Sequence, residues 1–387
     1  MLIVSELFYP NKTSTAYIMT EIAKKMAMEE DVVVITSDVK YDSNVYEGSE
    51  NLSGINIVNQ TSVQFNKNNT LLRALGSFVN SLLLSLSIFS NIKKNEKLLA
   101  VTNPFLLILI IAVIKKVKKF DYTLLVHDVF PENTVPAAIS NENSFTYQIL
   151  LKAYNWAYRQ ADQLIVLGSD MKQLIAEKGV NENKIKVIPN WYDDDLETRS
   201  INKNEYYKNI DTKNKIIIGF AGNIGRVQGL ERFIAVFNKV SNPDLLLFIV
   251  GEGANLEICK KQAASPNIYF LGAKPRHEQN LFLNSFDIGL ITLAEGMYGI
   301  GVPSKTYNLL ALGKPVFYVG DKNSEIDVLN HKQNIGWSFD WSDEEKMIKT
   351  LNAIKSVKFS AQNMNLAQSN FREDIILEKI KKVVFDV

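Results

Sequence analysis

The chain contains one cysteine and three histidines among its 387 residues. A single cysteine excludes an internal disulfide bond and any metal cluster held by cysteine ligands. The histidines, His127, His277 and His331, are far apart in the sequence and lack the spacing of paired metal ligands. We therefore expect no metal site, and we expect Cys259 to be a small buried hydrophobic residue.

The sequence also lacks an excess of charge of one sign, and it lacks a long apolar run. Its 43 basic and 42 acidic residues leave a net charge of +1, which gives no overall attraction to nucleic acid. The longest apolar run, 105–114, is too short to cross a bilayer, which takes about 20 residues. The first residues show no signal-peptide pattern, so we expect a cytoplasmic protein.

What is present is typical of a globular protein with two domains. Hydrophobic residues make up 46% and charged residues 22% of a chain that is too long for one core. Short β-branched runs such as 2–5 and 32–36 alternate with segments of helical periodicity, which predicts parallel sheets. The same alternation restarts at 216–220, after a polar stretch at 193–214.

We therefore predict an α/β protein with two Rossmann-like parallel-sheet domains that face one central cleft. The predicted ranges are 1–192 for an N-terminal domain, 193–365 for a C-terminal domain, and 366–387 for a C-terminal helix that packs back toward the first domain. Open sheets of this kind bind ligands beyond the carboxyl ends of their strands.

One stretch, 299–316, has the features of a phosphate site. A loop of small residues follows a predicted strand and turns into a short helix at Pro303, a residue that suits a first helical turn. Ser304 is expected to cap this helix, Lys305 adds a cation, and the amide of Asn308 is able to bond a pair of hydroxyls. The same residues also fit an ordinary junction between a strand and a helix.

Residues 71–119 combine apolar runs with basic ends. Eight basic residues stand against Glu96 alone, which gives this stretch a charge of +7. They are Arg73, Lys93, Lys94, Lys97, Lys115, Lys116, Lys118 and Lys119. Apolar helices with basic ends suit the surface of an anionic membrane. The alternative is a set of packed core helices whose lysines lie in solvent.

Several short motifs occur in a fixed order along nearly the whole chain. They are Phe8-Tyr9-Pro10, His127-Asp128-Val129-Phe130-Pro131-Glu132, Ile188-Pro189-Asn190-Trp191, Gly222-Asn223-Ile224-Gly225-Arg226-Val227-Gln228-Gly229, Val250-Gly251-Glu252-Gly253, Phe270-Leu271-Gly272 and Val302-Pro303-Ser304-Lys305-Thr306-Tyr307-Asn308. Together they resemble the retaining glycosyltransferases of family 4, which have the two-Rossmann GT-B fold. The resemblance is greatest to bacterial transferases that build O-antigen, capsule and similar surface polysaccharides from nucleotide-activated amino sugars.

The resemblance implies a UDP-sugar donor that is held mainly by the C-terminal domain, with no further cofactor. His127, Arg226 and Lys305 match the catalytic positions. The residues implied around the donor are Gly222, Asn223, Gly251, Glu252, Gly253, Leu271, Arg276, Glu295, Gly301, Val302, Pro303, Ser304 and Asn308. Thr15, Asp128 and Glu132 are implied on the acceptor side.

The chain departs from the family pattern at three places. The Gly-Gly of the first loop is replaced by 13–15, and Gln228 stands where the family has a second cation of the phosphate site. The family's pair of glutamates, which are separated by seven residues, is degenerate here. Asn308 takes the second position, and Ile300 the first, so Glu295 is the candidate for the missing acid.

The implied reaction moves a sugar to a polyprenyl-diphosphate-linked saccharide at the inner face of the plasma membrane, with retention and without a metal. Arg226 and Lys305 would stabilise the leaving diphosphate electrostatically. Two alternatives remain open. One is a UDP-sugar 2-epimerase of the same fold, and the other is a non-catalytic membrane-associated partner in polysaccharide assembly. The acidic run 193–195 is expected to be a solvated turn rather than a metal site.

Overall fold

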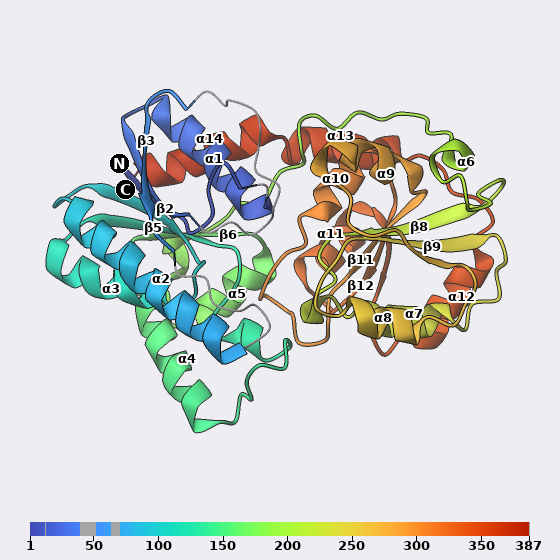
Figure 1. Cartoon of the computed structure of the whole chain (residues 1–387), viewed down its shortest axis with the longest axis horizontal. Helices are drawn as coiled ribbons and strands as arrows, with labels where there is room; N and C mark the ends of the chain where they lie inside the picture. Colours follow the sequence, from blue (N-terminus) through green and yellow to red (C-terminus); the bar gives the residue numbers. More distant parts are fainter. Residues whose placement is uncertain (12, 39–51, 63–69, 387) are drawn as a thin grey trace. The chain divides into compact units, whose positions relative to one another are not determined.

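The computed structural model describes residues 1–11, 13–38, 52–62 and 70–386. The chain divides into two compact units (Figure 1). Unit 1 comprises Met1–Glu132, Glu142–Ile188 and Leu377–Val387, and unit 2 comprises Asn133–Asn141 and Pro189–Ile376. The ranges 1–192, 193–365 and 366–387 stay predictions, and the place of the short segment 133–141 in unit 2 has no counterpart in the sequence patterns.

Within the described residues, unit 1 is built on a seven-stranded parallel sheet with the order β3-β2-β1-β4-β5-β6-β7. Its strands are β1 (Leu2–Val4), β2 (Val32–Ser37), β3 (Ile55–Gln60), β4 (Lys97–Val101), β5 (Asp121–Val126), β6 (Gln163–Val166) and β7 (Ile185–Val187). The central strands are buried along almost their whole length, which is why they read as continuous apolar runs.

Helices cover both faces of this sheet. They are α1 (Ser14–Ala27), α2 (Thr70–Asn91), α3 (Leu107–Lys118), α4 (Phe145–Tyr158) and α5 (Ser169–Glu177), with 3-10 turns at Glu132–Thr134 and Glu182–Lys184. In Figure 1, α2, α3 and α4 lie side by side, and α3 contacts both of the others. The helix α1 starts after Thr13, whose Oγ1 accepts a hydrogen bond from Ala16 N at 3.2 Å and so caps the first turn.

The last helix, α14 (Glu373–Phe385), begins in unit 2 and ends in unit 1. Two ion pairs attach its final turns to the end of α1 and the residues after it. Lys25 pairs with Glu378 at 3.0 Å, and Lys381 pairs with Glu29 at 2.8 Å. The C-terminal residues therefore belong to the fold of unit 1.

Unit 2, which is described throughout, is built on a six-stranded parallel sheet with the order β10-β9-β8-β11-β12-β13. Its strands are β8 (Ile216–Ala221), β9 (Leu245–Val250), β10 (Ile268–Phe270), β11 (Ile288–Thr292), β12 (Val316–Val319) and β13 (Gly336–Phe339). Its helices are α6 (Lys203–Tyr206), α7 (Leu230–Phe237), α8 (Leu256–Gln262), α9 (Gln279–Ser285), α10 (Lys305–Ala311), α11 (Glu325–Gln333), α12 (Glu344–Ala353) and α13 (Ala361–Asn370), with 3-10 turns at Arg226–Gln228 and Arg276–Glu278.

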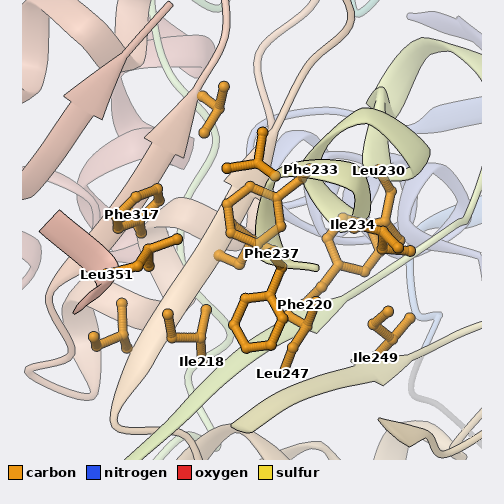
Figure 2. Packing of buried hydrophobic residues seen from close by; sticks show 14 of the residues in the cluster. Ile218, Phe220, Leu230, Phe233, Ile234, Phe237, Leu247, Ile249, Phe317 and Leu351 are labelled. Carbon is orange, nitrogen blue, oxygen red and sulfur yellow. The ribbon is translucent and has the colours of Figure 1, made fainter. Parts of the chain in front are cut away.

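The core of unit 2 lies between this sheet and α7. Figure 2 shows Phe233 and Phe237 of α7 among side chains of β8 and β9, with Phe317 of β12 on the other side of Phe233. The Phe233 and Phe317 rings meet edge to face, with centroids 5.8 Å apart. Cys259 is fully buried in the same cluster, which confirms its prediction as a small hydrophobic residue.

Both sheets have the same topology. From a pair of central strands, β1 and β4 or β8 and β11, the chain winds outward first in one direction and then in the other. The prediction of two Rossmann-like parallel sheets is therefore confirmed. In such a sheet the connections diverge where the order reverses, and ligands bind beyond the carboxyl ends of those two strands. For unit 2 this point lies after β8 and β11.

Candidate functional site

The loops at the carboxyl edge of the unit 2 sheet are joined to one another by main-chain hydrogen bonds. The donor and acceptor pairs are Gly222 N to Val250 O at 3.0 Å, Ile224 N to Glu252 O at 2.8 Å, Gly251 N to Gly272 O at 2.9 Å, and Ala294 N to Val227 O at 2.8 Å. The bonds link the loops that follow β8, β9, β10 and β11. Residues that are far apart in sequence thus form one continuous edge. It lies beside the switch point, which is the place after β8 and β11 where the strand order reverses.

Glycine allows these loops to approach so closely. A Cβ atom on Gly251 would lie 1.9 Å from the carbonyl oxygen of Gly222, and one on Gly253 would lie 2.4 Å from that of Ile224. Both glycines also have positive φ angles, +144° and +157°. The motif residues Gly251 and Gly253 therefore have a packing reason, whereas a Cβ atom on Gly222 would meet no atom within 4 Å. The main chain along this edge carries few side-chain atoms.

Gln228, which replaces a family cation, closes the loop after β8. Its Oε1 accepts a hydrogen bond from Gly225 N at 2.9 Å. Arg226 starts the 3-10 turn of this loop, and its side chain is exposed. Its Nη1 lies 3.4 Å from the carbonyl oxygen of Ala137, in the short segment that belongs to unit 2.

The loop after β11 is held by Asp321, a residue that the sequence patterns did not indicate. Its carboxylate accepts hydrogen bonds from Gly296 N at 3.1 Å and from Tyr298 N at 2.7 Å. Glu295, the candidate for the missing family acid, is exposed and pairs with Arg232 at 3.1 Å. Arg232 in turn lies over the Trp341 ring, 4.6 Å from its centroid.

The expected helix cap at Ser304 is wrong. Ser304 has helical backbone angles, φ −64° and ψ −24°, and its side chain makes no capping hydrogen bond. A capping side chain needs an extended backbone to reach the free N–H groups of the first turn. The turn begins instead at Pro303, whose carbonyl oxygen accepts from Thr306 N at 3.2 Å.

The prediction that the acidic run 193–195 is a solvated turn is wrong for Asp193. It was predicted in a solvated turn, but its exposed fraction is 9%, while Asp194 and Asp195 are exposed. Its carboxylate accepts a hydrogen bond from Arg276 Nη2 at 2.6 Å and another from Asn308 Nδ2 at 2.9 Å. Arg276 and Asn308, which were both predicted to lie around the sugar donor, therefore hydrogen-bond to the same buried carboxylate.

Lys305 is the first residue of α10, and its Nζ hydrogen-bonds to Oε1 of Gln279. Burial lowers the pKa of the Lys305 ammonium group, and the negative charge of Asp193 opposes this. Gln279 itself is buried, at 7% exposure, and it was not found from the sequence because a lone glutamine in a helix has no distinguishing pattern.

The other residues that were predicted around the sugar donor lie along the same carboxyl edge of the unit 2 sheet. Asn223 and Glu252 are exposed, Leu271 N donates to Ile249 O at 2.9 Å, and the run Gly301, Val302 and Pro303 is partly exposed before α10. Among the described residues, no group of three His, Cys, Asp or Glu side chains could hold a metal ion.

In unit 1, His127 and Asp128 follow β5 at the carboxyl edge of the sheet. The backbone N–H groups of both donate to Thr102 Oγ1, at 3.2 and 3.3 Å. His127 Nε2 is buried and has no hydrogen-bond partner among the described residues. Burial lowers the pKa of His127 to about 4, so the imidazole is neutral at pH 7.

Glu132 and Thr15, both predicted on the acceptor side, are held differently. Glu132 forms an ion pair with Lys178, whose side chain is 3% exposed. Lys178 Nζ also donates to Asn155 Oδ1 at 3.2 Å. Thr15 lies in the first turn of α1 and is partly exposed. Glu132 is thus half-buried and paired with a buried lysine, whereas Thr15 keeps access to solvent.

Two family models match the chain. The model described as Glycosyltransferase Family 4 matches residues 19–196, and the model described as Glycosyl transferases group 1 matches residues 202–369. A relative, the probable glycosyltransferase WbjE of Pseudomonas aeruginosa, is 31% identical over 99% of this chain and 96% of its own length.

Solved structures share the fold. The structure of Alr3699/HepE from Anabaena in complex with UDP and glucose covers 100% of this chain and 99% of its own, with a TM-score of 0.71 and 15% identity. Sucrose-phosphate synthase from Thermosynechococcus elongatus covers 99% of this chain and 97% of its own, with a TM-score of 0.75 and 11% identity. At these identities the likeness concerns the fold alone.

Proposed function

The chain belongs to the GT-B glycosyltransferases of the bacterial polysaccharide type, and from this premise we propose that it transfers a sugar from a UDP-sugar bound by unit 2. The observation that carries the proposal is the hydrogen bond from Ala294 N to Val227 O. It joins the loops after β8 and β11, which flank the switch point where open parallel sheets bind ligands. The solved relative with UDP and glucose has the same fold.

We propose that the donor diphosphate binds Arg226 and Lys305. Arg226 extends from the glycine-rich loop after β8, and Lys305 starts α10 at the end of the loop after β11. An exposed guanidinium suits the oxygens of a phosphate because its N–H groups form a planar fork. The close approach at Gly251 and Gly253 joins the loops of this edge to one another.

In the proposed reaction, the bond between the sugar C1 and the diphosphate oxygen breaks, and an acceptor hydroxyl oxygen forms the new bond to C1. The hydroxyl proton passes to the leaving diphosphate. We propose retention, with the acceptor entering on the face from which the diphosphate leaves. Negative charge develops on the leaving group, and Arg226 and Lys305 stabilise it electrostatically. This route requires no metal, because the two side chains supply the positive charge.

His127 is proposed to bind a sugar hydroxyl through its side chain. Because its pKa is lowered to about 4, it acts as a neutral hydrogen-bonding group rather than as a cation. The buried Nε2, which has no partner within the described residues, is the atom available for this bond. The proposal of an N-acetylated amino sugar rests on the motif resemblance.

The proposed acceptor is a lipid-linked saccharide, and unit 1 offers a surface that suits a membrane. Along α2, large apolar side chains are exposed at helical spacing: Phe78 46%, Leu82 41%, Leu86 67% and Phe89 45%. On the neighbouring α3, Val113 is 55% and Val117 67% exposed. Lys118 of α3 lies over the Phe89 ring, 4.5 Å from its centroid, so the two apolar rows adjoin. We call these six side chains the apolar stripe.

Lysines lie at the ends of these two helices. Lys93, Lys94, Lys116 and Lys119 are exposed, which fits attraction to anionic headgroups. Lys115 does not share this role, because it pairs with Asp162 and donates to the carbonyl oxygen of Phe120 at 3.0 Å. Within the described residues, no helix has both the length and the apolar character needed to span a bilayer. We therefore propose peripheral attachment to the inner leaflet.

The experiment that tests the donor proposal is a calorimetric titration of the full chain with UDP, GDP and ADP. We expect UDP to bind, GDP and ADP to bind at least tenfold more weakly, and Arg226→Ala to lose most of the UDP affinity. The matched control is Arg199→Ala. The Arg199 side chain is exposed in the same unit and, among the interactions described, pairs only with nearby Glu197. Binding of none of the nucleotides would contradict the proposal.

A second measurement addresses the reaction. Incubation with UDP-N-acetylglucosamine or UDP-glucose and a polyprenyl-diphosphate-linked saccharide as the acceptor, followed by detection of released UDP and of the glycosylated acceptor, is expected to show turnover that favours the N-acetylated donor. The anomeric proton of the product, observed by NMR, reports retention or inversion. Interconversion of the UDP-sugar at C2 without UDP release would instead identify an epimerase.

A further inference from the structure

The carboxylate of Asp193 is the centre of a buried hydrogen-bond network in unit 2. Its Oδ1 accepts from Arg276 Nη2 at 2.6 Å, and its Oδ2 accepts from Asn308 Nδ2 at 2.9 Å. In the other direction, Asp193 N donates to Asn308 Oδ1 at 3.1 Å. Asn308 is 4% exposed, so its amide is held in one orientation by this two-way contact.

Gln279 extends the network to Lys305. Its Nε2 donates to Oδ2 of Asp193, and its Oε1 accepts from Lys305 Nζ. Since an amide has its donor and its acceptor on opposite sides, the bond to Asp193 turns the oxygen of Gln279 toward Lys305. The position of the Lys305 ammonium group is therefore coupled to the carboxylate of Asp193 through one side chain.

We propose that Asp193 is a positioning residue for the donor diphosphate, which fixes Lys305 through Gln279 and fixes Arg276 and Asn308 directly. The inference rests on the proposed function, in which Lys305 binds the diphosphate. Asp193 does not touch the donor in this scheme. Its role is to hold two cations, Lys305 and Arg276, in a fixed arrangement before the donor arrives, so that less side-chain entropy is lost on binding.

The network also controls the charge of Lys305. Burial lowers the pKa of the ammonium group, and among the nearby charges Asp193 has the largest effect and raises it. Arg276 lowers it and Asp195 raises it. Removal of the negative charge at position 193 must therefore lower the pKa of Lys305 further. The loss of the ammonium proton, and with it part of the attraction to a diphosphate, would then occur at a lower pH.

The test is UDP binding by Asp193→Asn between pH 6 and pH 10, measured by calorimetry on the full chain. We expect roughly tenfold weaker binding at pH 7.5. We also expect the decline of affinity at basic pH to move to lower pH. A residue with only a structural role would lower the melting temperature without moving that decline. The matched control is Asp194→Asn, because Asp194 is the exposed neighbour. It should keep the wild-type affinity and pH profile.

Gln279→Met provides a second variant in case Asp193→Asn does not fold. Methionine has a similar length but cannot connect Asp193 to Lys305, while the Asp193 bonds to Arg276 and Asn308 remain. We expect weaker UDP binding here too. If the folded variants bind UDP with wild-type affinity and pH profile, the inference is wrong while the proposed function stands. If the wild-type chain binds no UDP, both fail.

Discussion

At the carboxyl edge of unit 2, main-chain hydrogen bonds join the glycine-rich loops, with the Asp321 side chain as a further support, whereas in unit 1 side-chain oxygen atoms accept from the main chain of the loop after β5. In unit 2 the bonds from Gly222 N to Val250 O and from Gly251 N to Gly272 O need no side chain. In unit 1, Thr102 Oγ1 accepts from His127 N, and Tyr158 accepts from Phe130 N at 3.1 Å through its hydroxyl oxygen. Two sheets that wind in the same way from their central strands, one with seven strands and one with six, therefore end in edges of different chemistry.

The difference indicates what each edge is able to bind. Bare main chain with a few cations suits a diphosphate, which is small, highly charged and bonded by N–H groups. An edge lined by side chains, with a neutral His127 beside an exposed Asp128, suits hydroxyl groups, which need donors and acceptors in a defined arrangement. The fold is common to both units, and the loops carry the function.

The largest expected effect comes from Gly251→Ala. The new Cβ would lie 1.9 Å from the carbonyl oxygen of Gly222, in a backbone with φ +144°, so the two loops must separate. We expect the free energy of unfolding of unit 2 to fall by about 3 kcal/mol and UDP binding to be lost. Urea denaturation, followed through tryptophan fluorescence, measures the first effect, because three of the four tryptophans lie in unit 2. Calorimetry measures the second.

The matched control for that variant is Gly272→Ala. Gly272 also has a positive φ, +70°, but its Cβ would meet no atom within 4 Å. Only the strain of the left-handed backbone remains, about 1 kcal/mol. Equal losses of unfolding free energy in the two alanine variants would show that the close approach of the loops is not the reason for glycine at position 251.

The second prediction removes a side-chain contact of unit 1, the ion pair between Glu132 and Lys178. Lys178→Met removes the partner of Glu132 and leaves a half-buried carboxylate without its cation. We expect a loss of about 3 kcal/mol in the free energy of unfolding, measured by thermal denaturation, with UDP affinity unchanged. The double variant Lys178→Met with Glu132→Gln should recover part of the stability, because no buried charge is left. A double variant less stable than Lys178→Met would contradict this account of the pair.

Much of the fold followed from the sequence. The apolar runs that became β1, β2, β8 and β9 could be recognised because strands buried on both faces are continuously apolar. The loops of the candidate site were found through their glycines, since close main-chain approach excludes other residues. Both signals are local, so a sequence shows them directly.

The Asp193 network could not be found in this way. Its partners Arg276 and Asn308 are 83 and 115 residues away, and the next residue, Asp194, is exposed. An acidic run in a polar stretch therefore gives the same local signal whether or not one member is buried. The wrong prediction of a cap at Ser304 has a similar cause. Serine is a residue type that often caps a helix, but its helical backbone angles here prevent this, and the sequence does not show them.

The third prediction concerns the dependence of stability on pH that arises from His127 at the carboxyl edge of unit 1. The pKa of His127 is lowered to about 4 in the folded chain, against about 6.5 in an unfolded chain. Between these values the unfolded state binds more protons, so stability decreases as the pH falls from about 6.5 to 4. We expect the wild type to lose about 1–2 kcal/mol relative to His127→Asn between pH 7 and pH 5, measured by urea denaturation at each pH. Parallel losses in both proteins would assign the acid sensitivity to other groups.

The smallest expected effect concerns the apolar stripe, which distinguishes unit 1 from unit 2. Lys116 lies exposed on α3 beside Val117, whereas Lys261 lies exposed on α8 of unit 2. Each lysine near an anionic surface contributes about 1 kcal/mol, so Lys116→Gln should weaken binding to phosphatidylglycerol vesicles about fivefold in a flotation assay. Lys261→Gln removes the same charge from the chain and should leave binding unchanged. Equal weakening by both variants would mean that net charge, and not the position of the lysine beside the stripe, governs membrane attraction, and the proposed surface on α2 and α3 would be wrong.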